Sequence, residues 1–292
     1  MTYRPPIHEL RLDPVTLEVN HIAMSKRMIR KAYGLTDRGS VLVLGCGSCK
    51  EIPIEALIAA SPLHLVDIDG EALRGVRDDL ASKGMDLDGV TFTNEDITGL
   101  IAPLSREVEA ALTTTSDAHD ACRRLVHLLD HAEMAFWSPR HGTRYSLIVC
   151  SLVLTQLQAV ALSRLEGIFL KHYPAGRSVL AAHKDWNHTK FRFARRLEEA
   201  FVDHLKLMAA RNAILYVSST IRVCYMKRMV SGLFSTQGSW IAAKTGCLAD
   251  YFASGDETIR EASWPWFLLR QENGSDGRLY DVQALTLRLK GK

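Results

Sequence analysis

Short apolar runs alternate with amphipathic stretches along the first half of this chain. The runs cover residues 40–44, 63–67, 90–94 and 145–150. Each is compact and contains β-branched or aromatic side chains, which is typical of strands buried in a sheet. Residues 51–60 and 71–83 lie between them and carry apolar positions at helical spacing. Strands and helices in this order predict parallel βαβ units.

Further helices are predicted around this core. The helical segments cover residues 15–33, 121–132, 152–170 and 191–208. The segment 121–132 lies in an insertion that is longer than a simple crossover needs. The apolar run 178–182 predicts a fifth strand. Residues 213–255 can be read as strand or helix, and we interpret them as a second insertion or a substrate cover.

The C-terminal segment predicts an antiparallel hairpin. Residues 264–270 and 280–289 flank the sequence QENGSDGR, whose Asn-Gly and Asp-Gly pairs indicate a chain reversal. The predicted fold class is therefore α/β, with a doubly wound, mostly parallel seven-stranded sheet, a C-terminal antiparallel hairpin and helical insertions. We expect one domain. Its parts are an N-terminal helical cap (1–39), a core (40–100 and 145–186), helical insertions (101–144 and 187–260) and the hairpin (261–292).

Composition and charge limit the possible binding partners of the chain more than they limit its fold. Of the 292 residues, 47% are hydrophobic, and the net charge of +3 is too small to argue for a nucleic-acid partner. The N-terminus lacks the pattern of a signal peptide and no apolar run is long enough to span a membrane, so we expect a cytoplasmic protein without a membrane partner. The six scattered cysteines predict free thiols and no metal site.

A glycine turn and a distant acid carry the chemical signal. Gly45-Cys46-Gly47 follows the first strand, and glycine lets the backbone turn sharply and approach a ligand closely. Asp67 ends the second strand, 22 residues after Gly45, where a carboxylate can accept both hydroxyl hydrogens of a ribose. Together they predict a nucleoside site. A tight turn at the glycines and a helix cap at Asp67 are the structural alternatives.

The third glycine position of a dinucleotide fingerprint is Lys50 here, followed by Glu51. A lysine side chain prevents close helix packing, and an acid at the helix start would repel a diphosphate. This argues against a nucleotide-dependent oxidoreductase. A nucleoside cofactor without phosphate and with an ammonium group tolerates the acid.

The segments 40–100 and, more loosely, 145–185 resemble the class I S-adenosylmethionine-dependent methyltransferases. The resemblance implies S-adenosyl-L-methionine as cofactor, with Gly45, Cys46 and Gly47 under its amino-acid part. It also implies ribose contacts from Asp67 and its neighbour Ile68, and adenine contacts from Asp96 and Ile97. Cys150 and Ser151, after the fourth strand, would lie near the methyl group. The chain departs from the family pattern because no acid precedes Gly45 and because Ser48 replaces a third glycine.

The sequence says less about the methyl acceptor than about the cofactor. His183 and Asp185 follow the predicted fifth strand, at the sheet edge where such sites open, and we expect one of them to deprotonate or orient the acceptor. Solvated loop residues are the alternative. The tip Cys150-Ser151-Leu152 lacks the Asn/Asp-Pro-Pro-aromatic motif of enzymes that methylate nucleobases. The helical insertions and the tryptophans suit a lidded pocket, so we expect an O- or N-nucleophile of a small molecule. A protein side-chain acceptor, and a non-catalytic methyltransferase-like binding module, stay open, as does the oligomeric state.

Overall fold

The computed structural model describes residues 13–228, 234–236, 239–242, 248–252, 256–269 and 276–290. The helices are α1 (Pro14–Tyr33), α2 (Ile54–Ile58), α3 (Gly70–Ser82), α4 (Ile101–Thr113), α5 (Ala118–His131), the 3-10 turn η2 (Arg140–Gly142), α6 (Val153–His172), α7 (Arg177–Ala182), α8 (Lys184–Met208) and α9 (Ala249–Phe252). The strands are β1 (Val41–Leu44), β2 (Leu63–Asp67), β3 (Val90–Asn94), β4 (Tyr145–Ser151), β5 (Ala209–Arg228), β6 (Phe234–Thr236), β7 (Ile241–Ala242), β8 (Glu257–Leu269) and β9 (Asp276–Arg288).

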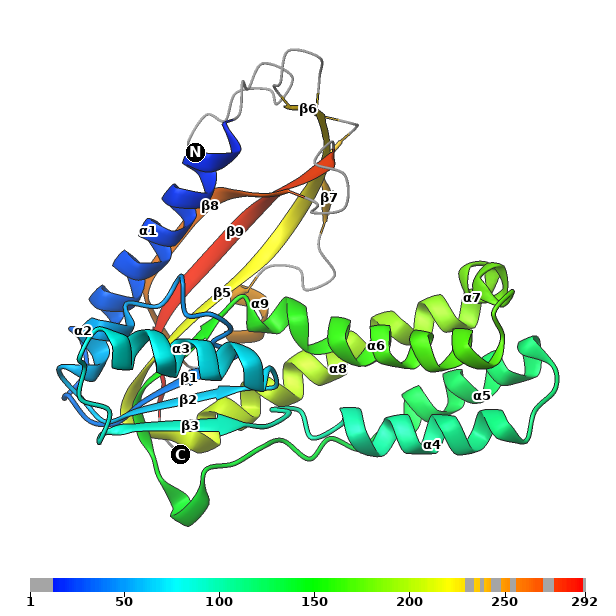
Figure 1. Cartoon of the computed structure of the whole chain (residues 1–292), viewed down its shortest axis with the longest axis horizontal. Helices are drawn as coiled ribbons and strands as arrows, with labels where there is room; N and C mark the ends of the chain where they lie inside the picture. Colours follow the sequence, from blue (N-terminus) through cyan, green and yellow to red (C-terminus); the bar gives the residue numbers. More distant parts are fainter. Residues whose placement is uncertain are drawn as a thin grey trace.

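The sheet has the predicted architecture. Its main path runs β3-β2-β1-β4-β5-β9-β8, and the short strands β6 and β7 pair with β5. The strands from β3 to β5 are parallel to their neighbours, whereas β9 is antiparallel to both β5 and β8. The fold class, a mostly parallel α/β sheet closed by an antiparallel hairpin, is therefore confirmed (Figure 1).

The central strands bury both faces, and this alternation creates two hydrophobic cores. In β1, Val41 and Val43 pack on one side with α1, α2 and α3, whereas Leu42 and Leu44 pack on the other with α4, α5, α6 and α8. All four side chains are fully buried. A strand covered on both faces needs apolar residues at every position, which explains the continuous apolar runs in the sequence.

The prediction of a fifth strand at residues 178–182 is wrong. These residues form helix α7, in which only Leu180 is fully buried. The fifth strand is β5, which lies between β4 and β9 and belongs to the segment 187–260 that we interpreted as an insertion. Its residues 213–220 are all buried, as a central strand requires. A five-residue apolar run fits either structure, and the sheet selected the run that could be covered on both faces.

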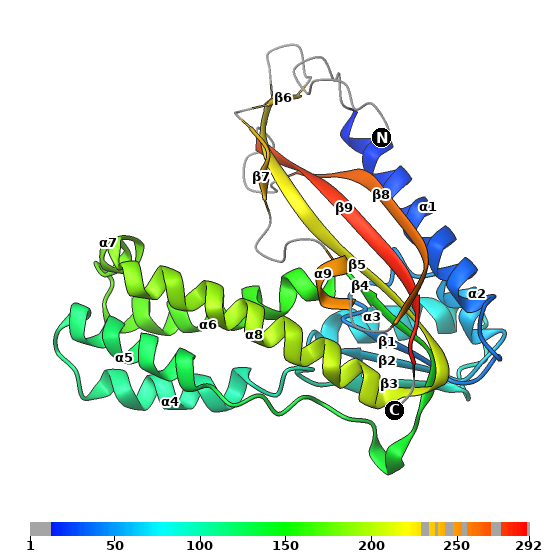
Figure 2. The same ribbon diagram turned by 180° about the vertical axis from the view of Figure 1, so that it is seen from behind.

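The inserted helices form an arm beside the sheet. α4 and α5, between β3 and β4, pack with α6 and α8, and this bundle projects to one side of the sheet with α7 near its far end (Figure 1). On the other side, α1 runs along β8, and the long strands β5, β8 and β9 extend together past the body of the sheet (Figure 2). The helical prediction for 101–144 therefore matches α4 and α5.

The C-terminal hairpin is longer than predicted, because β8 and β9 pair from Glu257 to Leu269. Pro265 is tolerated in β8, which lies at the edge of the main sheet path. The predicted reversal QENGSDGR lies largely outside the described residues. In the part of the chain that the structure describes, no helix has the length and apolarity needed to cross a membrane.

Candidate functional site

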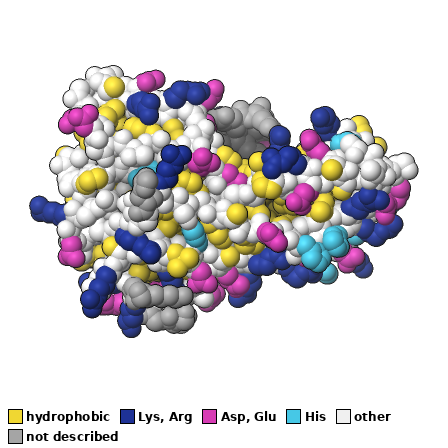
Figure 3. Space-filling view, turned by 90° about the horizontal axis from the view of Figure 1, so that it is seen from below, with side chains coloured by type: hydrophobic (Ala, Val, Ile, Leu, Met, Phe, Trp, Pro, Cys, Tyr) yellow, Lys and Arg dark blue, Asp and Glu magenta, His cyan; other side chains and the backbone are white. Residues whose placement is uncertain are grey.

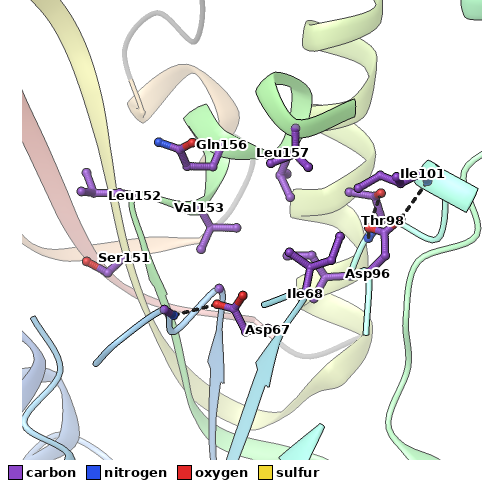
Figure 4. A pocket seen from close by; sticks show the side chains of 14 residues that line it. Asp67, Ile68, Asp96, Thr98, Ile101, Ser151, Leu152, Val153, Gln156 and Leu157 are labelled. Atoms are coloured by element: carbon purple, nitrogen blue, oxygen red, sulfur yellow. Dashed lines mark hydrogen bonds between the residues drawn. The ribbon is translucent and has the colours of Figure 1, made fainter. Parts of the chain in front are cut away.

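A cavity of about 230 Å³, here called the first cavity, opens where β1, β2 and β4 end and α6 begins (Figure 4). Its lining residues are Gly45, Gly47, Asp67, Ile68, Asp96, Ile97, Thr98, Ile101, Ser151, Leu152, Val153, Gln156, Leu157 and Val160. The carboxyl ends of parallel strands form such a crevice because the connections to the following helices diverge there. Most of the residues predicted from the glycine turn and the strand tips therefore come together at one place.

The glycine turn has the backbone conformation that its sequence predicts. Gly45 has φ +61° and Gly47 has φ +48°, a region that side chains with a Cβ rarely adopt. The Gly45 N–H donates to the carbonyl oxygen of Val66 at 2.8 Å, so the turn is tied to the end of β2. A Cβ on Gly45 would lie 2.7 Å from Cγ2 of Val153 at the start of α6. A residue with a Cβ at position 45 would therefore require Val153 or α6 to move.

Asp67 holds the loops around the first cavity together. Its Oδ2 accepts the Gly47 N–H at 2.7 Å, and its Oδ1 accepts the Asp69 N–H at 2.8 Å. Only 7% of Asp67 is exposed. Each carboxylate oxygen has a further lone pair, so the same group can still accept hydrogen bonds from a ligand. The helix cap of α3 is Asp69, whose side chain accepts from Glu71 and Ala72.

Asp96 has a mainly structural task. Its Oδ1 accepts the backbone N–H and the hydroxyl of Thr98, and its Oδ2 accepts the N–H of Ile101 at 2.8 Å. Ile101 is the first residue of α4. The carboxylate therefore orders the start of this helix, and Asp96 also lines the first cavity.

One wall of the first cavity is apolar. Ile68 and Val160 line it, with 46% and 41% of their surface exposed. Ile101 and Leu157 complete this wall (Figure 4). Our sequence analysis missed the residues from α4 and α6. The first turn of the helix after β4 always faces this crevice, and that rule could have identified Gln156 and Leu157.

The tip of β4 is bent into position. Leu152 has φ +59°, and its N–H donates to both the carbonyl and the hydroxyl oxygen of Ser218 in β5. A leucine in this conformation is strained, and such strain is common at functional sites. Cys150 is fully buried in the core and does not line the first cavity, so its contact with the cofactor stays a prediction. Burial raises the pKa of its thiol.

A second cavity of about 320 Å³ adjoins the first. The two share Gly45, Gly47, Ser151, Leu152 and Gln156. The remaining lining residues are Glu18, His21, Ile22, Cys46, Ser48, Cys49, Lys50, Glu51, Ile52, Trp266 and Leu268. Cys46 is 7% exposed, and its interaction with Cys49 together with burial raises the pKa of its thiol. The two cavities are therefore neighbours, and the glycine turn is part of the wall of both.

His183 and Asp185 do not lie where the sequence predicted them. Because residues 178–182 form α7 and not a strand, neither residue follows a strand tip. Nδ1 of His183 accepts the N–H of Trp186 and caps α8, and Asp185 lies in the first turn of that helix. Both residues lie beside α7 in the arm, away from the strand tips, and neither lines the first or second cavity (Figure 1). The catalytic role was predicted from a position after a strand at the open edge of the sheet, and the two residues do not have that position.

The charged side chains do not form a broad patch of one sign on the visible face. Lys and Arg side chains are interspersed with Asp and Glu side chains over both the sheet and the arm (Figure 3). A polyanion partner needs basic residues gathered on one face. On this face, the distribution agrees with the small net charge of the chain.

Comparisons with known proteins find similarity only in structure. No protein-family model matches the chain, and no curated protein matches its sequence. Among solved structures, the chain is similar to the glycopeptide N-methyltransferase MtfA complexed with S-adenosyl-L-methionine (10% identity, 97% of this chain and 100% of that chain covered, TM-score 0.40). It is also similar to the YcgJ protein from Bacillus subtilis (10%, 92% and 99%, 0.45). A third is an S-adenosylmethionine-dependent methyltransferase from Clostridium acetobutylicum (10%, 96% and 93%, 0.39).

Proposed function

We propose that this chain is an S-adenosylmethionine-dependent methyltransferase that acts on an oxygen or nitrogen atom of a small molecule. The observation that carries the proposal is the Asp67 carboxylate, held at the tip of β2 beside the Gly45–Gly47 turn and facing the first cavity. A carboxylate in this place accepts hydrogen bonds from both hydroxyl groups of an adenosine ribose. The apolar wall of Ile68, Ile101 and Val160 suits a flat adenine ring.

The site favours a cofactor without phosphate. A diphosphate needs the free N–H groups of a helix N-terminus at the cavity. Neither cavity is lined by α2, the helix that follows the glycine turn and begins only at Ile54. The carboxylates of Asp67 and Glu51 would repel a diphosphate, whereas they suit a ligand with an ammonium group and a positive sulfur.

The chain's own residues would mainly align the reactants. When bound, S-adenosylmethionine supplies a methyl group that its sulfonium sulfur already activates. Asp67 would orient the nucleoside, and the Gly45–Gly47 turn allows the amino-acid part to pass into the second cavity. Alignment of this kind lowers a barrier by several kcal/mol. The second cavity, of about 320 Å³, must also admit the acceptor, which favours a small molecule.

The proposal is tested by calorimetry with S-adenosylhomocysteine, the demethylated product. We expect the wild-type protein to bind it and Asp67→Asn to bind it about tenfold or more weakly, because one accepting oxygen becomes a donor. Asp78→Asn is the control, since Asp78 is an exposed acid on α3. No heat of binding and no shift in melting temperature with the wild-type protein would refute the assignment, as would equal affinities for both variants.

A further inference from the structure

Beyond the glycine turn, the second cavity contains a carboxylate that the nucleoside site does not use. Glu51 follows the turn and is 22% exposed. Its Oε2 accepts the hydroxyl of Ser151 at 2.8 Å, and its Oε1 lies 3.0 Å from Nε2 of His21 in α1. Burial acts to raise the pKa of Glu51, but the contacts with His21 and Ser151 outweigh it and hold this pKa below its ordinary value. The group is therefore a carboxylate at neutral pH.

His21 presents one ring nitrogen to this carboxylate and the other to Trp264. The indole N–H of Trp264 donates to Nδ1 of His21 at 2.8 Å. An indole can only donate, so Nδ1 accepts this bond with its lone pair, while Nε2 lies on the side of the ring that faces Glu51. The ring is 1% exposed and is stacked on Trp266 at 4.7 Å between ring centroids.

Among the described residues, the one contact of Glu51 within ion-pair distance is with the ring of His21, so no Lys or Arg side chain compensates its charge. A largely buried carboxylate is costly unless a positive group compensates it. This one lines the second cavity, which shares five lining residues with the predicted nucleoside site. Such a geometry is complementary to a positive ligand group that enters over the glycine turn.

We propose that the second cavity binds an alkylammonium group, with the Glu51 carboxylate as its counter-charge and His21 as the positioning residue for that carboxylate. The inference rests on the proposed function for the first cavity. The ammonium group has two possible sources with the same chemistry, namely the amino-acid part of the cofactor and an amine acceptor. Ser151 holds Oε2, and His21, supported by Trp264 and Trp266, holds Oε1. The carboxylate is therefore fixed before the ligand arrives.

The first experiment compares S-adenosylhomocysteine with its analogue that lacks only the α-amino group. If the cofactor is the source, the wild-type protein binds the complete ligand at least about tenfold more tightly. In Glu51→Gln this ratio falls close to one, whereas Glu55→Gln, an acid that pairs with Lys83 at the surface, leaves it unchanged. Binding of the analogue itself tests the nucleoside site, so failure of the proposed function is seen separately.

The second experiment tests the other source. n-Butylammonium chloride is titrated into protein saturated with S-adenosylhomocysteine, with sodium chloride as the control. If an acceptor amine is the source, the wild-type protein binds this probe and Glu51→Gln does not. In that case the ratio of the affinities for S-adenosylhomocysteine and its analogue without the α-amino group is the same in the wild-type protein and in Glu51→Gln. If neither the ratio nor the probe depends on Glu51, the inference is wrong.

Positioning by His21 has its own test. His21→Phe retains a flat ring beside Trp266 but lacks the ring nitrogen that lies 3.0 Å from Oε1 of Glu51, so the ratio or the probe affinity should fall part of the way towards the Glu51→Gln value. Because His21 is buried, Ser151→Ala serves as a second variant that releases the other carboxylate oxygen. If both variants fold and keep the wild-type affinity ratio and the wild-type affinity for the probe, His21 does not position Glu51.

Discussion

Gly45 and Gly47 share a left-handed backbone but differ in their surroundings. A Cβ at Gly45 would lie 2.7 Å from Val153, whereas one at Gly47 would meet no atom within 4 Å. Gly47→Ala should therefore lose about 1 kcal/mol of unfolding free energy from its backbone conformation alone. Gly45→Ala should lose clearly more, because Val153 or α6 must also move.

Denaturant unfolding of both variants measures this difference. Adding Val153→Ala to Gly45→Ala removes the contact, so the second substitution should cost less in that background than in the wild-type protein. Equal losses for the two glycine variants would contradict the assigned packing.

His64 makes the stability of the fold depend on pH. It lies in β2, with Nδ1 2.8 Å from the Tyr145 hydroxyl and Nε2 2.8 Å from that of Thr93. Burial lowers the pKa of His64 from 6.5. The unfolded chain therefore binds a proton at a pH where the folded chain does not, so stability is present above about pH 6.5 and is lost as the pH falls through the folded pKa.

Unfolding free energies between about pH 7.5 and pH 5.5 test this dependence. His64→Gln should show a smaller decrease than the wild-type protein, and the exposed His172→Gln should show the wild-type decrease. A His64→Gln variant with an undiminished decrease would exclude this histidine as the cause.

Among the elements, the contact between α5 and α8 fixes the arm. Arg196 of α8 donates to the carbonyl oxygens of Leu129, Asp130 and Ala132, which end α5. These carbonyls lack partners within their own helix, and a cation also suits a helix C-terminus. Arg196→Ala should therefore lower the unfolding free energy by about 1 kcal/mol.

The neighbouring Arg195 provides a matched control. Its ion pair is with Glu199, one turn along on the exposed surface of α8, so Arg195→Ala should leave denaturant unfolding nearly unchanged. If Arg195→Ala were as destabilising as Arg196→Ala, capping of α5 would not explain the loss.

The elements also show where sequence patterns are ambiguous. The strands β1 to β4 were predictable because each is an isolated apolar run between polar turns. Residues 178–182 and 214–218 are equally short apolar runs. The second run pairs with a strand on each side, β4 and β9, whereas the first forms a helix. Strand selection here depended on partners that are distant in the sequence.

For the whole molecule, the sheet and the arm meet at the first cavity. The strand tips supply Gly45 and Asp67, and the arm helices supply Ile101 and Leu157. One large core of apolar side chains joins the sheet face to α4, α5, α6 and α8. A change in the arm packing would therefore move one wall of the cavity against the other.

The glycine turn, the acid at the end of β2 and the parallel core follow from the amino-acid pattern alone, because positive φ, strand burial and βα rhythm are local properties. The contact of Glu51 with His21, and that of His21 with Trp264, do not follow from the pattern, since these residues lie in separate parts of the chain and His21 and Trp264 are 243 residues apart. Only chain packing could place α1 and β8 beside the turn. For the same reason His183 and Asp185 lie in the arm, because the course of the chain after β4 was set by which run the sheet could cover.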